Sequence, residues 1–371
     1  HAWANTFGTL AVAWEGLRLV TDMGQPDLTA IVAAMMLLLA NLLAGIVIAW
    51  LYGRVAGVRE ALPAILIIAG IHGLGQLALV TFTPTLANFL PGTVAVGAVL
   101  WLARTRWYRG QSQIENSPIM AEEKEPEAGG WAHEGPKVER ERPQMPLPLA
   151  LTPYVLLVIL IFVVLLIPPI EGALSSFQIG LPFPRLETGY GVITEATDAY
   201  SEFAPLTHPG TFLLVAAVLA YVLFRSQGHI KGEDGKLGNI LKDTIGTSIP
   251  TAIAVLTLVS LAKVLEGSGQ ILVLALGIAA VAPPLVYVIV APFIGMLGAF
   301  TAASNLSSNI LFGPLQESTA AALDLPPPLV LAGQTAGGAV GNSIAPGNVL
   351  LGLGAVGIVG ESGTVIRHTI I

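Results

Sequence analysis

The chain has 371 residues, of which 54% are hydrophobic and 11% are charged, and its mean hydropathy is +0.74. Soluble domains carry roughly 25% charged residues, so this composition indicates an α-helical membrane protein. The absence of cysteine excludes disulfides, thiolate metal sites and cysteine nucleophiles. The net charge of −7 comes without a basic stripe, which argues against a nucleic-acid partner.

The apolar runs predict a polytopic bundle, because about 20 apolar residues span the hydrocarbon core as a helix. The predicted spans cover residues 31–51, 62–82, 91–103, 149–167, 211–224, 245–265 and 271–290. The polar stretch 104–148 cannot bury enough surface to fold and is predicted to be a flexible loop. Residues 170–208 are too apolar for disorder and too interrupted for one span. Basic residues gather in alternate connections, which places the 104–148 loop on the cytoplasmic side.

Residues 295–316 combine membrane depth with a dense polar centre. The hydroxyl and amide side chains of this centre are Thr301, Ser304, Asn305, Ser307, Ser308 and Asn309. Such groups are costly in lipid unless they line a cavity or bind a ligand. With Pro292 before them and Pro314 after them, the pattern predicts a re-entrant helical hairpin at 292–316.

A second segment, 329–360, predicts a discontinuous helix. The apolar run breaks at 341–348, where Pro346 and Gly347 interrupt it, and resumes from Val349. A half-helix that begins near Asn348 directs its positive N-terminal end at the break, which suits an anion. Ser and Asn patches also join helices, and glycine patches allow close helix packing. That alternative applies to each segment taken alone; the proximity of both segments favours a binding site.

The same segments resemble the L-lactate permease family. The resemblance rests on Ser304-Asn305-x-Ser307-Ser308-Asn309 with Phe312-Gly313, on Gly337 to Asn342 with Asn348-Val349, and on Gly357 to Glu361 with Arg367-x-Thr369. The opening His1-Ala2-Trp3 with Thr6-Phe7-Gly8 is also similar. The likeness covers most of the chain outside the 104–148 loop. Ala302-Ala303 and the weakly polar Ile344 to Gly347 depart from the family pattern, which bears on the identity of the substrate more than on the fold.

The resemblance implies an inverted-repeat secondary transporter with a re-entrant hairpin and a discontinuous helix in each repeat. Residues 1–103 would then be the end of the first repeat, and 149–371 the second repeat. We expect the chain to be truncated at both ends, without the first hairpin. The implied function is proton-coupled uptake of lactate, glycolate or a related monocarboxylate.

The predicted substrate-binding residues come from the hairpin tip and from the break. They are Thr301, Ser304, Asn305, Ser307, Ser308, Asn309, Asn342, Ser343 and Asn348. No Lys or Arg lies beside them to clamp a carboxylate. Neutral donors and helix ends suit a monocarboxylate better than a di- or tricarboxylate.

Proton coupling requires a group that titrates near neutral pH, and His72 and His1 are the predicted candidates. A histidine held by hydrogen bonds in a bent helix is the alternative for His72. Lys263 and Glu266 fit an ion pair near a span end, and Glu361 fits a solvent-exposed acid. If none of these groups titrates, Na⁺ coupling becomes the alternative, because unwound carbonyls and Ser or Asn oxygens are suitable ligands.

We therefore predict a multi-pass carrier of the cytoplasmic membrane with no cofactor, no resident metal and no catalytic residues. Its partners are the lipid bilayer and a small organic anion, and a homodimer is left open. The alternatives are an intramembrane enzyme, for which no catalytic motif is present, and a channel, for which no repeated pore-lining pattern is present. The chain also lacks the phosphate-binding loop of an ATP-driven pump.

Overall fold

The computed structural model describes residues 6–108, 145–165, 167–187, 193–230 and 237–356, together with residues 363, 365 and 367. The chain divides into two compact units. The larger unit contains His1–Glu123, Leu186–Thr194 and Val255–Ile371, and the smaller contains Lys124–Arg185 and Glu195–Ala254. Most of the loop predicted at 104–148, together with His1, Gly357 to Glu361 and Thr369, lies outside the described residues.

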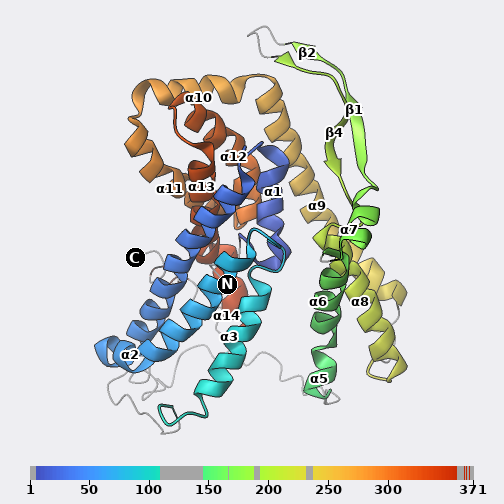
Figure 1. Ribbon diagram of the computed structural model, residues 1–371, viewed down its shortest axis with the longest axis vertical. Coiled ribbons are helices and arrows are strands. Elements are labelled where there is room, and N and C mark those ends of the chain that lie inside the picture. Colours follow the sequence, from blue (N-terminus) through green and yellow to red (C-terminus); the bar gives the residue numbers. More distant parts are fainter. Residues whose placement is uncertain are drawn as a thin grey trace. The chain divides into compact units, whose positions relative to one another are not determined.

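The larger unit is built mainly from helices (Figure 1). Its elements are η2 (Thr9–Ala11), α1 (Val12–Val20), α2 (Pro26–Leu79), α3 (Phe89–Leu102), the end of α9 (Leu237–Gly267), α10 (Gln270–Val281), α11 (Pro284–Ala302), α12 (Asn305–Ala322), α13 (Pro327–Ile344), α14 (Pro346–Val356) and the short strands β2 (Leu186–Glu187) and β3 (Ile193–Thr194). Its main core cluster joins Phe7, Trp14 and Leu17 to Leu37 of α2 and Leu331 of α13.

Helix α2 has 54 residues, about 80 Å at 1.5 Å per residue, which exceeds the ~30 Å hydrocarbon thickness. It consists of two helical segments separated by non-helical backbone at Gly53 and Arg54. Arg54 has a φ of 52°, and its guanidinium carbon lies 4.2 Å from the ring centroid of Trp50. The spans predicted at 31–51 and 62–82 lie on the two sides of this kink.

The prediction of one span at 271–290 was wrong. Helix α10 ends at Val281 and α11 begins at Pro284. Pro283 has an extended backbone with ψ of 140° and caps α11. Residues that precede a proline avoid the helical region, so the Pro283-Pro284 pair separates the two helices although the whole run is apolar.

The smaller unit contains α5 (Leu147–Ala150), α6 (Thr152–Leu165), α7 (Pro168–Ser175), α8 (Pro209–Ser226), the start of α9 and the strands β1 (Ile179–Phe183) and β4 (Thr197–Phe203). Helices α6 and α7 meet at a bend of 86°. β1 pairs with β4 in antiparallel register, and β2 pairs with β3 in the larger unit. These strands occupy the semi-polar stretch 170–208, for which the sequence predicted no defined structure.

Among the described residues, four helices are long and apolar enough to cross a membrane: α2, α8, α9 and α11. The bent pair α6–α7 would make a fifth span, while α3 and α10 are shorter apolar helices. By length and composition, the prediction of a polytopic α-helical membrane protein is confirmed for the part of the chain that the structure describes.

Candidate functional site

Helices α11 and α12 form a helix–turn–helix whose turn is Ala303–Ser304. Ala303 adopts the left-handed conformation (φ 49°), and Ser304 caps α12 by accepting the N–H of Ser307 at 3.1 Å. The helix pair runs from Pro284 to Ala322, beyond the predicted hairpin 292–316. Pro292 and Pro314 lie inside the two helices and do not mark their ends.

The sequence predicted a break at 341–348 in the second segment, and the structure limits this break to one residue. α13 ends at Ile344, α14 begins at Pro346, and Ala345 between them is extended, with ψ of 136°. Pro346 forces this geometry, because its ring disfavours a helical conformation at the preceding residue.

The turn of the helix pair and the α13–α14 break lie next to each other. Asn348, in the first turn of α14, donates from Nδ2 to the backbone oxygen of Asn342 at 2.6 Å and to Asn342 Oδ1 at 2.8 Å. The same amide nitrogen lies 3.5 Å from the carbonyl oxygen of Ala303. Two segments that are 45 residues apart in sequence thus share a polar junction.

A second polar cluster is buried behind this junction. Asn305 Nδ2 donates to the carbonyl of Thr335 at 3.2 Å and to Thr6 Oγ1 at 3.3 Å. One helical turn later, Asn309 Nδ2 donates to the carbonyl of Ala13 and to Thr335 Oγ1, both at 2.9 Å. Both asparagines are almost fully buried, and neither Oδ1 has a hydrogen-bond partner within the described ranges. The cluster therefore ends in two unsatisfied acceptors, which are costly in a buried environment.

A separate chain of side-chain hydrogen bonds begins at Tyr287 of α11. Tyr287 donates to Gln316 Oε1 at 2.6 Å, and Gln316 Nε2 donates to Gln334 Oε1 at 3.0 Å. Gln334 Nε2 in turn donates to Ser308 Oγ at 3.1 Å, and that hydroxyl donates to the carbonyl of Gly295 at 3.0 Å. This chain links α11, α12 and α13.

Glycines allow α13 to lie directly against α11. A methyl group on Gly337 would fall on the carbonyl oxygen of Pro292, and one on Gly341 would fall on that of Met296. In the reverse direction, a methyl group on Gly295 would fall on the carbonyl oxygen of Gln334. With Gly333, these α13 glycines recur every four residues, the small-residue spacing that brings membrane helices into backbone contact. We call this contact the glycine seam (Gly295, Gly333, Gly337 and Gly341).

The structure does not bring all the predicted site residues together. Asn342 and Asn348 meet the turn at Ala303–Ser304, whereas Asn305, Ser308 and Asn309 face the buried cluster. Thr301 is exposed, and its hydroxyl donates to the carbonyl of Leu297 in its own helix at 2.9 Å. Ser343 likewise bonds within its helix, to Val340. Ser307 is partly exposed beside the turn.

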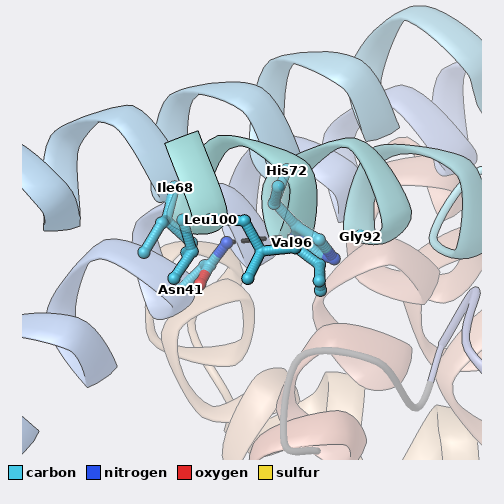
Figure 2. A pocket seen from close by; sticks show the side chains of 8 residues that line it. Asn41, Ile68, His72, Gly92, Val96 and Leu100 are labelled. Carbon is cyan, nitrogen blue, oxygen red and sulfur yellow. Dashed lines mark hydrogen bonds between the residues drawn. The ribbon is translucent and has the colours of Figure 1, made fainter. Parts of the chain in front are cut away.

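The predicted coupling residue His72 lies elsewhere, on α2, where it faces a cavity that residues of α3 also line. Asn41 Nδ2 and His72 Nδ1 are 3.1 Å apart, and both residues line a cavity of about 360 Å³ (Figure 2). The remaining lining residues are apolar or glycine: Ile68, Gly92, Ala95, Val96, Val99 and Leu100. His72 is therefore a buried, hydrogen-bonded histidine, and its role in coupling stays a prediction. Lys263 and Glu266 form the predicted ion pair at 3.1 Å.

Several polar residues of these clusters were not predicted from the sequence: Thr6, Tyr287, Gln316, Gln334 and Thr335. The signal for Gln334-Thr335 was present, since both interrupt the apolar run of α13. The contributions of Thr6 and Ala13 could not be predicted from the sequence, because their partners in α12 and α13 lie about 300 residues away along the chain.

Comparison with known proteins places these features in a family. The profile of the L-lactate permease family matches residues 2–371. A glycolate permease of Escherichia coli K12 is 26% identical over 331 residues, which cover 85% of this chain and 56% of the relative. An L-lactate permease of Halalkalibacterium halodurans is 26% identical over 95% of this chain and 60% of the relative.

An L-lactate permease of Escherichia coli K12 is 31% identical over 219 residues, 55% of this chain. The chain thus spans less than two thirds of the length of these relatives. No solved structure matches the chain. The profile match over nearly every residue shows that the chain belongs to the L-lactate permease family.

Proposed function

We propose that this protein is a secondary active transporter, a symporter that carries a small monocarboxylate such as lactate or glycolate together with a proton. It would work by alternating access in the cytoplasmic membrane, as a monomer or a homodimer. The relatives described as lactate and glycolate permeases support the class of substrate. The observation that carries the proposal is the meeting of the Ala303–Ser304 turn with the α13–α14 break through Asn348. We infer that α11–α12 is a re-entrant hairpin and that α13–α14 is a discontinuous helix of one repeat.

The carboxylate would be held between the hairpin turn and the break. Ser304, Ser307, Ser343 and Asn348 are partly exposed there. The hydroxyl groups of Ser304 and Ser307 can donate to a ligand directly, whereas Ser343 and Asn348 would exchange their bonds to Val340 and Asn342 for bonds to the ligand. The buried Asn305, Ser308 and Asn309 would fix the position of the hairpin, with Thr301 and Asn342 beside the turn and the break. Residues 284–356 contain no Lys or Arg, so neutral donors and helix ends would balance a single negative charge.

Na⁺ coupling is a second candidate, and one observation favours it. The amide oxygens of Asn305 and Asn309 lack hydrogen-bond donors in the described structure although both are buried. Oxygen atoms of this kind are ligands for hard cations, and an unassigned cation or water would satisfy them.

Uptake by the full-length gene product in proteoliposomes tests the proposal. Labelled lactate and glycolate would be offered with an inward proton gradient, an inward Na⁺ gradient, or neither. We expect proton-stimulated uptake. Asn348→Ala should lower this uptake about tenfold or more, because a hydrogen bond to a charged group contributes ~1.5–3 kcal/mol.

Ser176→Ala, an exposed change in the smaller unit, serves as the matched control and should leave uptake unchanged. Uptake that is stimulated by the Na⁺ gradient alone would contradict proton coupling and support Na⁺ coupling. Absence of uptake of both acids under every gradient would contradict the proposed function.

A further inference from the structure

One acidic side chain of the hairpin contacts a distant part of the chain. Glu317 lies on α12, outside the helices that are long and apolar enough to span a membrane. Its carboxylate reaches the turn that joins α1 to α2. Oε1 accepts the backbone N–H of Met23 at 2.9 Å, and Oε2 accepts that of Asp22 at 3.3 Å.

The turn is shaped to present these two N–H groups. Met23 and Gly24 both have positive φ, 54° and 61°. A positive φ at a side chain as long as that of Met23 is uncommon and persists only where the surroundings impose it. The Met23 side chain is 2% exposed and belongs to the main core cluster. The Glu317 carboxylate therefore connects α12 to a constrained turn through two hydrogen bonds, and both donors are backbone N–H groups.

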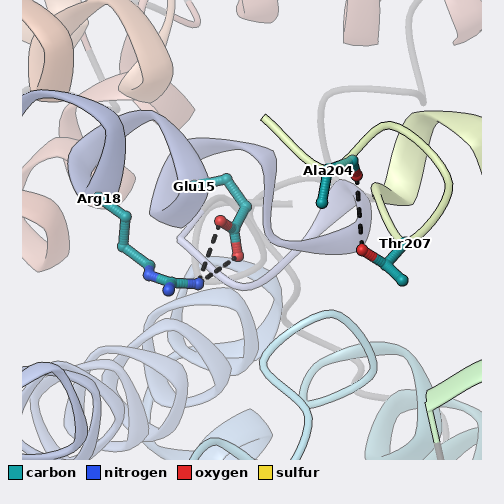
Figure 3. Close-up of polar contacts among 4 residues, drawn as sticks. All are labelled: Glu15, Arg18, Ala204 and Thr207. Atoms are coloured by element: carbon teal, nitrogen blue, oxygen red, sulfur yellow. Dashed lines mark hydrogen bonds and ion pairs between the residues drawn. The ribbon is translucent and has the colours of Figure 1, made fainter. Parts of the chain in front are cut away.

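Within the part of the chain that the structure describes, no cation pairs with Glu317. Asp22 on the turn and Glu266 on α9 are both acidic and act on Glu317 electrostatically. The cations of the adjoining helices have acidic partners of their own. Arg18 of α1 pairs with Glu15 at 3.3 Å (Figure 3), and Lys263 of α9 pairs with Glu266 at 3.1 Å. Figure 3 also shows Thr207 donating to the carbonyl of Ala204 at 3.4 Å, a contact within the smaller unit.

Burial raises the pKa of the Glu317 carboxyl above its ordinary value, and the two backbone N–H groups oppose this shift. The negative charges of Asp22 and Glu266 raise the pKa further. Loss of the two N–H hydrogen bonds would remove the influence that opposes burial and would favour the protonated carboxyl.

We propose that Glu317 is the proton-binding site of coupled transport, and that its protonation releases α12 from the α1–α2 turn. This inference rests on the proposed symport function and assigns the titrating group. The ionised carboxylate accepts both N–H groups. When a proton binds one carboxyl oxygen, that oxygen becomes a donor, its bond to the turn is lost, and the negative charge that strengthened both bonds disappears. The turn is then held by one neutral hydrogen bond.

The test separates proton-driven uptake from exchange, which needs no net proton movement. Glu317→Gln keeps the shape of the side chain and cannot titrate. In proteoliposomes with the full-length gene product, we expect this variant to exchange internal for external lactate at about the wild-type rate. A pH gradient of one unit supplies ~1.4 kcal/mol per proton, which corresponds to a tenfold ratio. Uptake driven by this gradient should therefore fall about tenfold in Glu317→Gln.

Glu60→Gln, which removes an exposed carboxylate of α2, is the matched control and should retain gradient-driven uptake. His72→Gln tests the competing candidate and should also retain it. Glu317→Gln with wild-type stimulation by the gradient would overturn the inference. Loss of both exchange and driven uptake, with an unchanged melting temperature, would overturn it as well, because the residue would then serve binding or structure.

If Glu317→Gln does not fold, Glu317→Asp decides the question. It retains a carboxyl group, but the side chain is one methylene shorter, so the carboxyl lies further from the α1–α2 turn. The midpoint of the pH profile of uptake should then shift, and an unchanged midpoint would contradict the inference. Wild-type protein that shows no uptake under any gradient would instead contradict the proposed function. The two failures are therefore distinguishable.

Discussion

The α11–α13 pair and the α2–α3 pair are both contacts between apolar helices, yet they differ in how the helices approach each other. At the glycine seam, backbone lies on backbone, and buried amides form a hydrogen-bonded chain. Between α2 and α3, side chains surround a cavity of about 360 Å³ with one polar pair, Asn41 and His72. The first contact fixes the relative position of two helices within narrow limits, whereas the second leaves room for side chains to move.

The largest expected effect comes from a methyl group in the seam. Gly337→Ala places Cβ on the carbonyl oxygen of Pro292, which is backbone and cannot rotate away. We expect a loss of at least ~3 kcal/mol in the free energy of unfolding, the upper range for overpacking. Reversible unfolding in mixed detergent micelles would measure it.

Gly70→Ala in α2 is the matched control for this change, since no atom lies within 4 Å of the added Cβ. It should be neutral or stabilise α2 by up to ~1 kcal/mol, the helix propensity difference. Equal effects of the two substitutions would show that the close contact between Gly337 and Pro292 does not constrain α13.

An intermediate effect is expected from the amide chain. Gln334→Leu removes the acceptor of Gln316 Nε2 and the donor to Ser308 Oγ, so buried groups lose partners. The expected cost is ~1–3 kcal/mol of unfolding free energy. Asn41→Leu, which removes one bond beside an open cavity, should cost about 1 kcal/mol or less, near the average for membrane hydrogen bonds. A larger loss for Asn41→Leu in the same unfolding assay would reverse the comparison.

The smallest effect is expected from filling the cavity. Ala95 lines it and is 6% exposed. Ala95→Leu should change the unfolding free energy by less than ~1 kcal/mol in either direction, because the larger side chain can enter the cavity and lipid outside the helices is as apolar as leucine. A melting curve in detergent measures the change. A decrease of several degrees would show that α2 and α3 are packed as tightly as the seam.

The sequence was informative where local chemistry decides the structure. Pro346 after a run of Gly, Asn and Ser predicted the break that the structure places at Ala345. The dense Ser and Asn residues predicted a hairpin tip at the cluster itself. The structure places the turn at the edge of the cluster, Ala303–Ser304, and places Asn305 to Asn309 within α12. Hydropathy failed at Pro283-Pro284, because an apolar run has the same average whether its helix continues or ends there.

Contacts between distant segments were out of reach for sequence reasoning. The partners of Asn309 include Ala13, 296 residues away, and those of Glu317 are the backbone groups of Asp22 and Met23. A backbone donor has no side-chain signature in sequence. His72 illustrates the same point, since its role as a titrating group or as a packed histidine depends on Asn41, which lies on the other segment of the kinked α2.

The glycine seam also limits how the hairpin can move. The carbonyl oxygens of Pro292 and Met296 lie directly against Gly337 and Gly341, in notches where no side chain can rotate aside. A small sliding movement of α11 along α13 would therefore cause a clash between the two backbones. The next equivalent notch on α13 lies four residues along, about 6 Å at 1.5 Å per residue. Helices α11 and α13 would therefore travel as a single rigid piece, or jump by a whole notch. Gradual changes in helix orientation would then occur at positions without such notches, such as the kink at Gly53–Arg54 in α2.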